Sequence, residues 1–235
     1  MYKLITPYIV QDEFENSSSE SNWVLHNQTY NGGTLQINNG KMSLKTLGGS
    51  DGYMGKGDVI KYNANYPNLL SDFANYQIEF NMEEILREKT NNYKDNVQFA
   101  LYIVDKNDEQ KGFIISLHGN YSGYDPMQQV GYNIYNAHKM VIYANNATNW
   151  QSAFAIQDLD LAQYYNYDYK IYFSDNVWKI DYKLANQTTY TTVNTTFSQT
   201  TNLDIRLMIS TGDGGVTRQN GKGTFNIDYF RIKQR

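Results

Sequence analysis

The sequence predicts an all-β protein of two packed antiparallel sheets, on three observations. Apolar and polar residues alternate with a period of two in a long series of short segments, which is the pattern of half-buried strands. The composition favours strands, with 22 Tyr and 10 Phe beside abundant Asn and Thr, whereas the helix formers Ala and Glu are sparse. Candidate strands succeed one another along nearly the whole chain. They are too many for one open sheet, so we expect two.

Each candidate strand is an alternating run bounded by turn residues. Three turns between neighbours are short and rich in Asn, Asp or Gly, namely INNGKM, VDKNDEQKG and FSDNVW, and they predict antiparallel hairpins. In chain order the predicted strands are 7–14, 22–26, 33–38, 40–46, 76–82, 96–105, 111–119, 130–135, 138–144, 151–157, 167–173, 177–184, 188–193, 203–210 and 223–233.

Helices have little room in this pattern. Three segments, 66–76, 82–90 and 158–165, are each long enough for one or two helical turns, and Ser71 and Asp72 are candidate caps of the first. No linker, proline-rich tract or repeat divides the chain, which has three prolines. We expect a single domain over 1–235.

The final segment, GTFNIDYFRIK, does not alternate cleanly. Phe225, Ile227 and Tyr229 share one side of an extended strand, whereas Phe230 and Ile232 fall on the other side. The change predicts a bulge, or a crossing that places the two apolar sets in different environments. Asp228 lies away from the first apolar set and is expected to be a structural hydrogen-bonding acid.

Charge and cysteine content exclude several classes of function. The net charge of −4 and the pI near 5.4 provide no basic surface for nucleic acid or for an anionic membrane. There is no cysteine, so disulfides and thiolate chemistry are absent. The N-terminus lacks the apolar stretch of a signal peptide, and no apolar run reaches the 18 residues of a membrane span. We expect no membrane insertion, and a location in the cytoplasm before release or in a virion.

The order of segments resembles the concanavalin A-like lectin and glucanase superfamily. The resemblance rests on DEFEN…SNW (12–23), GTLQINNGKMSL (33–44), YQIEFNM (76–82), YKIYFSDNVWKIDYK (169–183) and the closing LDIRLMISTG and GTFNIDYFRI. It implies a jelly-roll sandwich of two curved sheets, in which the last strand lies beside the first. The fold hosts lectins, hydrolases, lyases and structural modules, so it does not by itself imply an activity.

Glu79 and Glu83 are the candidate catalytic residues. Laminarinase-type hydrolases of this fold carry Glu-x-Asp-x-Glu on one strand of the concave face, and the outer two acids act as nucleophile and general acid/base. The corresponding stretch here is EFNME, with Asn81 in the central position. Gln77, Glu79, Asn81 and Glu83 face one way on a strand, but an ordinary half-solvated strand has the same pattern. The missing central Asp favours a non-catalytic protein.

Calcium is a possible cofactor. A calcium site needs six to eight oxygen ligands. Two glycine-rich segments, SDGYMGKGD (50–58) and STGDGG (210–215), offer carboxylates and carbonyls, and the resemblance implies that calcium sites occur among lectin-like relatives. The candidate ligands are Asp51, Asp58 and Asp213.

Two segments are dense in Tyr and Asn, namely residues 119–138 and 162–173. A sugar ring has an apolar face and a rim of hydroxyls, which Tyr stacking and Asn or Asp hydrogen bonds match. Tyr is also enriched in protein interfaces, so a protein partner stays open. The candidate glycan-binding residues are Asn120, Tyr121, Tyr124, Asp125, Tyr132 and Tyr135.

These observations favour a non-catalytic, lectin-like module that binds a cell-surface glycan or polysaccharide. A phage or virus component that contacts a host envelope fits the fold and the absence of a signal peptide. Two alternatives remain open. One is a structural virion or assembly subunit that binds only protein, either other virion subunits or further copies of itself. The other is a retaining glycoside hydrolase that uses Glu79 and Glu83.

Overall fold

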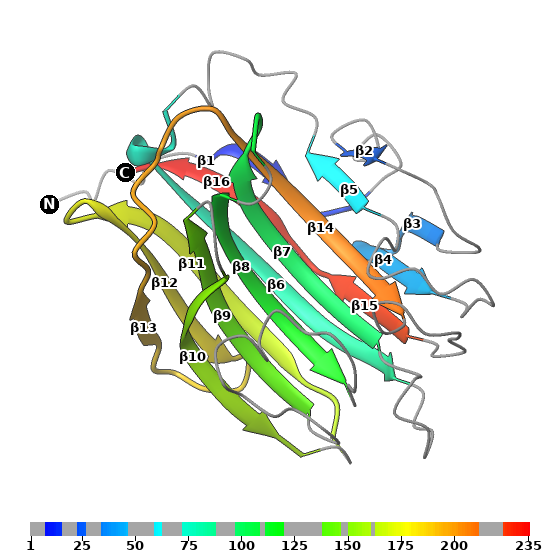
Figure 1. The fold of residues 1–235 in the computed structure, drawn as a ribbon. Coiled ribbons are helices and arrows are strands. Elements are labelled where there is room, and N and C mark those ends of the chain that lie inside the picture. The colour runs from blue at the N-terminus through cyan, green and yellow to red at the C-terminus, as the bar shows by residue number, and fades with distance from the viewer. Residues whose placement is uncertain are drawn as a thin grey trace, which may run out of the picture.

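The protein is described here as a computed structural model. The structure describes residues 8–15, 23–26, 34–46, 59–62, 72–87, 97–108, 111–119, 138–146, 150–160, 163–211 and 223–235. These residues form two antiparallel sheets packed face to face, an all-β jelly-roll sandwich (Figure 1). The fold class predicted from the sequence is confirmed.

The nine-stranded sheet is centred on β6. Its main order is β13-β12-β11-β6-β15-β4-β3, and β16 pairs with the first half of β6 and carries β1 on its other side. Its strands are β1 (Tyr8–Asp12), β3 (Thr34–Asn38), β4 (Lys41–Thr46), β6 (Tyr76–Arg87), β11 (Asn166–Ser174), β12 (Val177–Leu184), β13 (Thr191–Asn194), β15 (Gly223–Ile227) and β16 (Phe230–Gln234).

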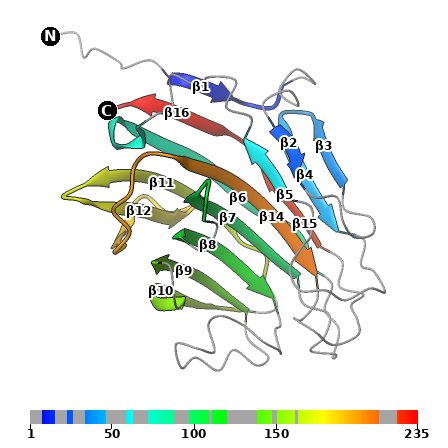
Figure 2. The ribbon, with the colours of Figure 1, turned by 45° about the horizontal axis from the view of Figure 1, so that its top comes forward.

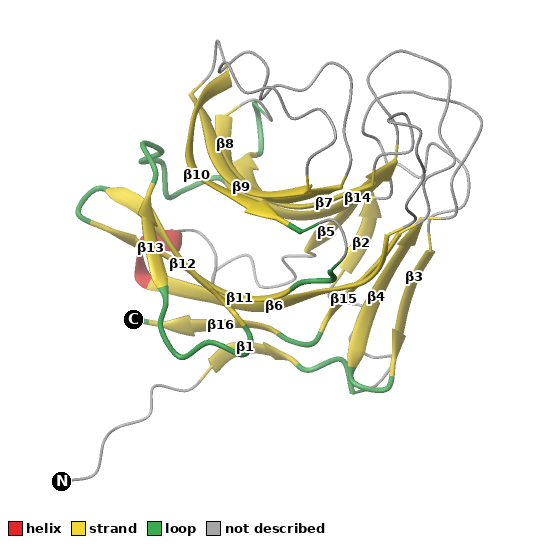
Figure 3. Ribbon diagram, turned by 90° about the horizontal axis from the view of Figure 1, so that it is seen from below, coloured by secondary structure: helices red, strands yellow, loops and turns green. Residues whose placement is uncertain are grey.

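The seven-stranded sheet has the order β10-β9-β8-β7-β14-β5-β2. Its strands are β2 (Trp23–His26), β5 (Val59–Tyr62), β7 (Val97–Asp105), β8 (Lys111–Gly119), β9 (His138–Asn146), β10 (Trp150–Leu159) and β14 (Leu203–Thr211). Both sheets curve in the same sense, and the seven-stranded sheet lies inside the curve of the nine-stranded one (Figure 3). The outer face of the seven-stranded sheet is therefore concave, and that of the nine-stranded sheet is convex.

The core fills the space between the sheets. Every second residue of the central strands points inward and is buried, as the period of two requires. Trp178 is fully buried among Phe73, Phe113 and Phe173, and its indole Nε1 donates a 2.8 Å hydrogen bond to the carbonyl of Gln199. That bond satisfies the one polar atom that this large side chain brings into the core.

Two of the predicted hairpins form through turns with left-handed backbone. Asn39 and Gly40 join β3 to β4 at φ values of 51° and 73°, and Asp175 and Asn176 join β11 to β12 at 55° and 63°. Asn, Asp and Gly adopt this conformation most readily, which is why the turn residues predicted these hairpins correctly.

The last strand is interrupted by Asp228 and Tyr229. Asn226 pairs with Glu83 and Phe230 pairs with Phe80. Between these two pairs the last strand advances by four residues while β6 advances by three. This is a one-residue bulge. It restores the inward direction for Phe230 and Ile232, which are buried in the same core as Phe225 and Ile227.

The predicted bulge is therefore correct, but the alternative of two separate environments for the apolar sets is wrong. The predicted neighbour of the last strand is also correct, because β16 pairs with β1 (Figure 2).

Of the three helix predictions, one is confirmed as a single turn with its predicted cap, and two are corrected in the described residues. Residues 82–87 continue β6, because β11 and β15 pair with that stretch from either side and outweigh its helical propensity. The segment 66–76 contributes, in its described part, one 3₁₀ turn, Phe73–Asn75, capped by Asp72. In 158–165, residues up to Leu159 belong to β10 and none of the described residues is helical.

One strand was missed by the sequence prediction, and one predicted strand is not tested. β5 was not predicted, since its four residues, VIKY, are too few to show a period. The predicted strand 130–135 lies outside the described residues. Among the residues that the structure covers, no helix has the length and apolar character needed to cross a bilayer.

Candidate functional site

One end of the sandwich gathers the segments that hold most of the predicted site residues. At this end β8 finishes at Gly119, which pairs with Val97, and Val97 pairs with Thr211, the last residue of β14. β9 starts beside them, since Lys139 pairs with His118. These strand ends lie at the lower right of Figure 1. We call this edge the loop end.

The predicted glycan-binding residues belong to the connection from β8 to β9. Asn120, Tyr121, Tyr124, Asp125, Tyr132 and Tyr135 lie within 120–137, outside the described residues. The described strand ends show where this connection starts and finishes, which is at the loop end, beside the edge of the concave face. Their role stays a prediction.

The predicted calcium ligands belong to two other connections that begin and end at the same edge. Asp51 and Asp58 lie between β4 and β5, and Asp213 lies between β14 and β15, all outside the described residues. Thr46 at the end of β4 pairs with Gly223 at the start of β15. Within the described ranges, no cluster of three or more acidic or histidine side chains is placed to hold a metal ion.

The floor of the concave face carries a buried ion pair. Asp204 and Arg206 alternate with the core residues of β14 and therefore point away from the core. Arg206 Nη2 lies 3.0 Å from Asp204 Oδ2, and the two residues are 8% and 5% exposed. Tyr102 of β7 is paired directly with Arg206.

Apolar and small residues surround this ion pair on the concave face. Ala100 and Val104 of β7 and Ile114 of β8 are buried and face the same way. Ser116 is also buried there, and its hydroxyl donates to the carbonyl of Phe99. The described floor is thus an apolar surface with one charged pair and one tyrosine at its centre.

Acidic residues are few on the described strands of the concave sheet. In its seven described strands the acidic residues are Asp105, Asp158 and Asp204, each on a different strand. A retaining mechanism needs two carboxylates on either side of one glycosidic bond. Asp204 is the one carboxylate among the described outward-facing side chains at the centre of this floor. It forms an ion pair with Arg206.

Glu79 and Glu83 lie on the other sheet. The resemblance implied a concave position, but β6 belongs to the nine-stranded sheet (Figure 3). Both glutamates alternate with the core residues of β6 and therefore face the convex side. Glu79 is 7% exposed and lies 2.6 Å from Lys233 Nζ, and Glu83 lies 2.8 Å from Lys41 Nζ. Lys41 also contacts Asp228, as expected for a structural acid. The geometry gives both glutamates a lysine counter-ion.

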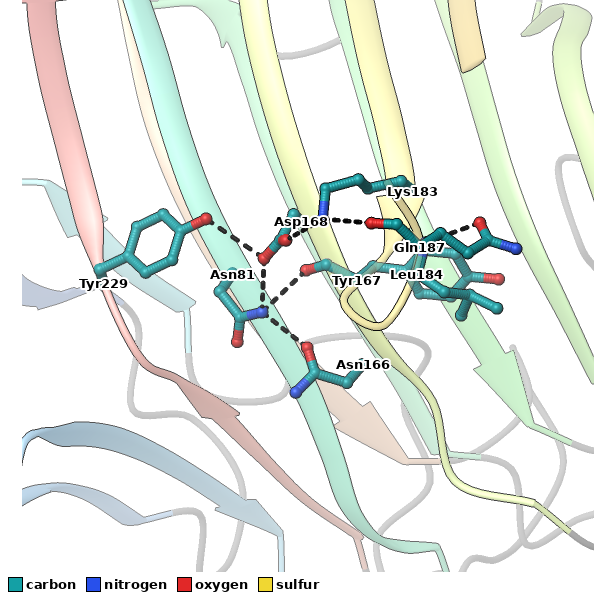
Figure 4. Close-up of polar contacts among 8 residues, drawn as sticks. All are labelled: Asn81, Asn166, Tyr167, Asp168, Lys183, Leu184, Gln187 and Tyr229. Atoms are coloured by element: carbon teal, nitrogen blue, oxygen red, sulfur yellow. Dashed lines mark hydrogen bonds and ion pairs between the residues drawn. The ribbon is translucent and has the colours of Figure 1, made fainter. Parts of the chain in front are cut away.

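Asp168 is the centre of a hydrogen-bonded network on the convex face (Figure 4). Asp168 lies on β11, where it is paired directly with Asn81 of β6 and with Lys183 of β12. Asn81 Nδ2 donates to Asp168 Oδ1 over 2.9 Å, the Tyr229 hydroxyl donates to the same oxygen over 3.2 Å, and Lys183 Nζ lies 2.9 Å from Oδ2. Burial alone would raise the pKa of Asp168, but Lys183 and Asn81 hold that pKa below its usual range.

Two tyrosines flank this network. Tyr229 lies at the bulge between β15 and β16, and Tyr190 precedes β13. Burial, together with nearby acids, raises the pKa of Tyr190 to about 12 and that of Tyr229 still further above its usual value. Both phenols are therefore neutral hydrogen-bonding groups at physiological pH.

Solved structures with the same architecture were found over almost the whole chain. The CBM2 module of the evolved Dit of Lactobacillus casei BL23 phage J-1 matches with a TM-score of 0.59 at 10% identity, over 97% of this chain and 95% of that one. The protein has a concanavalin A-like fold. The predicted superfamily architecture is confirmed by these matches.

Enzymes and lectins both occur among the similar concanavalin A-like structures. The Bacillus licheniformis β-glucanase matches with a TM-score of 0.54 at 13% identity, over 96% of this chain and 98% of that one. The VIP36 exoplasmic/lumenal domain, in a form with Ca²⁺ and Man2 bound, matches with a TM-score of 0.53 at 13% identity, over 95% and 86% of the two chains. No protein-family model matches the chain, and no curated protein matches it.

The sequence reasoning missed the concave ion pair and the convex network. Arg206 and Asp204 stand within LDIRLMIS, where their spacing of two was a visible signal of a shared face, but nothing local indicated the partner strand with Tyr102. Asp168, Asn81 and Tyr229 are up to 148 residues apart (229 − 81) and meet only through sheet pairing.

Proposed function

We propose that this protein is a non-catalytic carbohydrate-binding module that recognises a cell-surface glycan. The observation that carries the proposal is the end-to-end match to the CBM2 module of a phage Dit, together with a concave floor whose described central carboxylate, Asp204, is buried and paired with Arg206. The mannose-bound form of the VIP36 domain supports glycan recognition on the same architecture. The glucanase match leaves the fold compatible with catalysis, and the lysine partners of Glu79 and Glu83 support the non-catalytic proposal.

The proposed glycan site lies at the loop end and extends onto the concave floor. The Tyr- and Asn-rich connection 120–137 starts and finishes at this edge and supplies stacking and hydrogen-bonding groups. The Asp204–Arg206 pair and Tyr102 supply polar groups on a floor that is otherwise apolar. A desolvated ion pair stabilises a fold little compared with apolar residues of similar size, so its presence on this face favours a role in recognition.

The proposed setting is a virion, where the module contacts the envelope of a host. The phage origin of the Dit module supports this placement. In that setting the remaining partners are other virion subunits or further copies of the chain.

The proposal is tested by binding to a glycan array and to purified bacterial cell-wall polysaccharide. We expect binding by the wild-type chain and its loss in the triple variant Tyr121→Ala, Tyr124→Ala, Tyr135→Ala. Tyr164→Ala is the matched control, because Tyr164 is 50% exposed and lies outside the proposed site. A wild-type chain that binds no glycan, yet co-purifies with a particle, would identify a structural subunit instead.

Calcium belongs to the same proposal. Asp51, Asp58 and Asp213 are on connections that meet the loop end, so a bound cation would order the proposed glycan site. We expect EDTA to weaken polysaccharide binding and CaCl₂ to restore it. Equal binding in EDTA and in CaCl₂ would remove calcium from the proposal and leave the glycan site.

The hydrolase alternative has a direct test. We expect the wild-type chain and Glu79→Gln to be equally inactive when reducing ends are measured on β-glucans. Turnover by the wild type that Glu79→Gln abolishes would overturn the non-catalytic proposal.

A further inference from the structure

The convex face carries a polar patch that is more buried than an outer sheet face requires. Asn81 is 3% exposed, and the side chains of Lys183 and Asp168 are 13% and 17% exposed. Side chains on the solvated face of an antiparallel sheet are ordinarily open to water. Here Tyr229 lies on one side of them and Tyr190 on the other, both partly exposed. We call this group the convex patch.

Both tyrosine rings of the convex patch are held in place by cations. The Arg231 guanidinium lies 4.2 Å from the centre of the Tyr229 ring, and Glu13 in turn fixes Arg231 through two hydrogen bonds. The Lys170 ammonium lies 4.1 Å from the centre of the Tyr190 ring. Such contacts are attractive and restrict the rings. A ring that is already ordered loses little entropy when a ligand packs against it.

The turn before Tyr190 is also tied to the patch. Lys183 Nζ donates to the carbonyl of Gln187, and the Gln187 side chain accepts from the backbone of Leu184 (Figure 4). The lysine that pairs with Asp168 therefore also anchors the segment that carries Tyr190. The patch is a preorganised unit built from three strands, the bulge and the turn before β13.

The chemistry of the convex patch suits an uncharged, hydroxyl-rich ligand. It combines two phenol rings with a carboxylate, an ammonium group and an amide, which together offer stacking surfaces, donors and acceptors. Asn81 itself is buried, and its amide holds Asp168 in place by donating to Asp168 Oδ1. Asp168 is neutralised by Lys183 and Glu13 by Arg231, and Lys170 is paired directly across the sheet with Glu79 and Asp181, so neither sign of charge is in clear excess at the patch.

We propose that the convex patch is a second saccharide subsite, selective for neutral sugars, on the opposite side of the sandwich from the concave floor. The inference rests on the proposed carbohydrate-binding function and adds a site to it. Two separated subsites on one module would let a repeating polysaccharide be held at two points, which raises its apparent affinity without new contacts at either.

The test maps binding of defined oligosaccharides on the full chain. Laminaritriose, mannobiose and trigalacturonate are titrated into ¹⁵N-labelled protein, and dissociation constants are measured by calorimetry. We expect a neutral oligosaccharide to shift the backbone amides of Tyr190, Tyr229 and Asn81, whereas trigalacturonate leaves them unshifted. Shifts confined to amides away from the convex patch would overturn the inference.

Variants provide a second, independent readout. We expect Tyr190→Ala to weaken binding of the neutral oligosaccharide about tenfold, the size typical of losing one aromatic anchor. Tyr190→Phe keeps the ring and is expected to bind within about twofold of the wild type, as is the control Tyr164→Ala. Unchanged binding by a folded Tyr190→Ala would contradict the subsite, and if that variant does not fold, the amide shifts of the wild type decide.

The experiment separates this inference from the proposed function. Binding that is lost in the triple loop-end variant but unaffected by Tyr190→Ala retains the proposed function and removes the second subsite. Absence of binding to every oligosaccharide and to cell-wall polysaccharide removes both.

Discussion

At the scale of single residues, charge on the convex face is organised by pairing across strands. Asp168 receives hydrogen bonds from Asn81 and Tyr229 and pairs with Lys183, each on a different element. Because Asp168 is largely buried, the ionised form of its carboxylate is favoured only while these donors remain. Its stabilising effect therefore depends on the sheet being assembled.

Asp168→Asn is expected to destabilise the protein by about 2 kcal/mol, because it leaves Lys183 without its buried counter-charge. The free energy of unfolding in urea measures the effect. The matched control is Asp175→Asn, since Asp175 also pairs with a lysine, Lys179, but lies at an exposed turn. An equal loss of stability in the two variants would contradict the assigned role of burial.

Gly112 at the start of β8 is required by a close backbone approach. A Cβ atom at this position would lie 2.2 Å from the carbonyl oxygen of Ile103 and 2.8 Å from Cα of Val104, both parts of the neighbouring strand backbone. No side-chain movement can relieve such a contact.

Gly112→Ala is therefore expected to cost about 3 kcal/mol or more, the upper range for overpacking. Gly40→Ala is the comparison, because a Cβ there meets nothing closer than 3.7 Å and the cost is only the left-handed φ of 73°, about 1 kcal/mol. Urea denaturation of both variants measures the difference, and a Gly112→Ala protein as stable as Gly40→Ala would refute the steric argument.

At the scale of elements, the bulge between β15 and β16 decides which face of the last strand is buried. One extra residue lets Phe225 and Ile227 on one side of the bulge, and Phe230 and Ile232 on the other, point into the same core. A shift of one residue reverses every side chain beyond it. The bulge also places Tyr229 beside Asp168.

Insertion of one alanine between Tyr229 and Phe230 is expected to prevent folding, because it turns Phe230 and Ile232 outward. Burying such a side chain contributes roughly 1.5–3 kcal/mol, so losing two removes much of a typical domain's stability. Deletion of Asp228 is the control. It regularises the strand and keeps both residues inward, so that variant is expected to fold. Circular dichroism and thermal unfolding distinguish the two, and a folded insertion variant would contradict the assigned register.

At the scale of the whole molecule, carboxylates with lowered pKa values link its elements. Hydrogen bonding by Arg231 is the largest cause that lowers the pKa of Glu13, and hydrogen bonding by Gln199 is the largest for Asp105. Asp168 adds a third such group. These contacts join the residue that follows β1 to β16, the end of β7 to the turn before β14, and β11 to β6 and β12.

Stability is therefore expected to fall in acid. A carboxyl whose folded pKa is lowered stabilises the folded state above its unfolded pKa, and the contribution disappears as the pH drops through the folded value. The ordinary values are 4.5 for Glu13 and 3.8 for Asp105 and Asp168, so the unfolding midpoint in urea is expected to fall below about pH 4.5. Glu13→Gln should flatten this acid dependence, and an unchanged slope in that variant would contradict the Glu13–Arg231 contribution.

The alternation of apolar residues and the turn residues by themselves determined most of the described strands and the hairpins, because both signals act between near neighbours in the chain. They correctly predicted the β3–β4 and β11–β12 hairpins and the bulge at Asp228 and Tyr229. The sequence did not reveal the 82–87 extension of β6, because its helix-forming residues are held extended by pairing with β11 and β15.

Only the tertiary structure decided which sheet and which face each residue occupies. Sheet pairing joins residues that are far apart in the chain, and no local pattern records the partner. It placed Glu79 and Glu83 on the convex face instead of the concave one, and it brought the connections holding Asp51, Asp213 and Tyr121 to one edge. It also assembled Asp168, Tyr229 and Lys183 into one patch, because strands β6, β11 and β12 lie side by side next to the bulge.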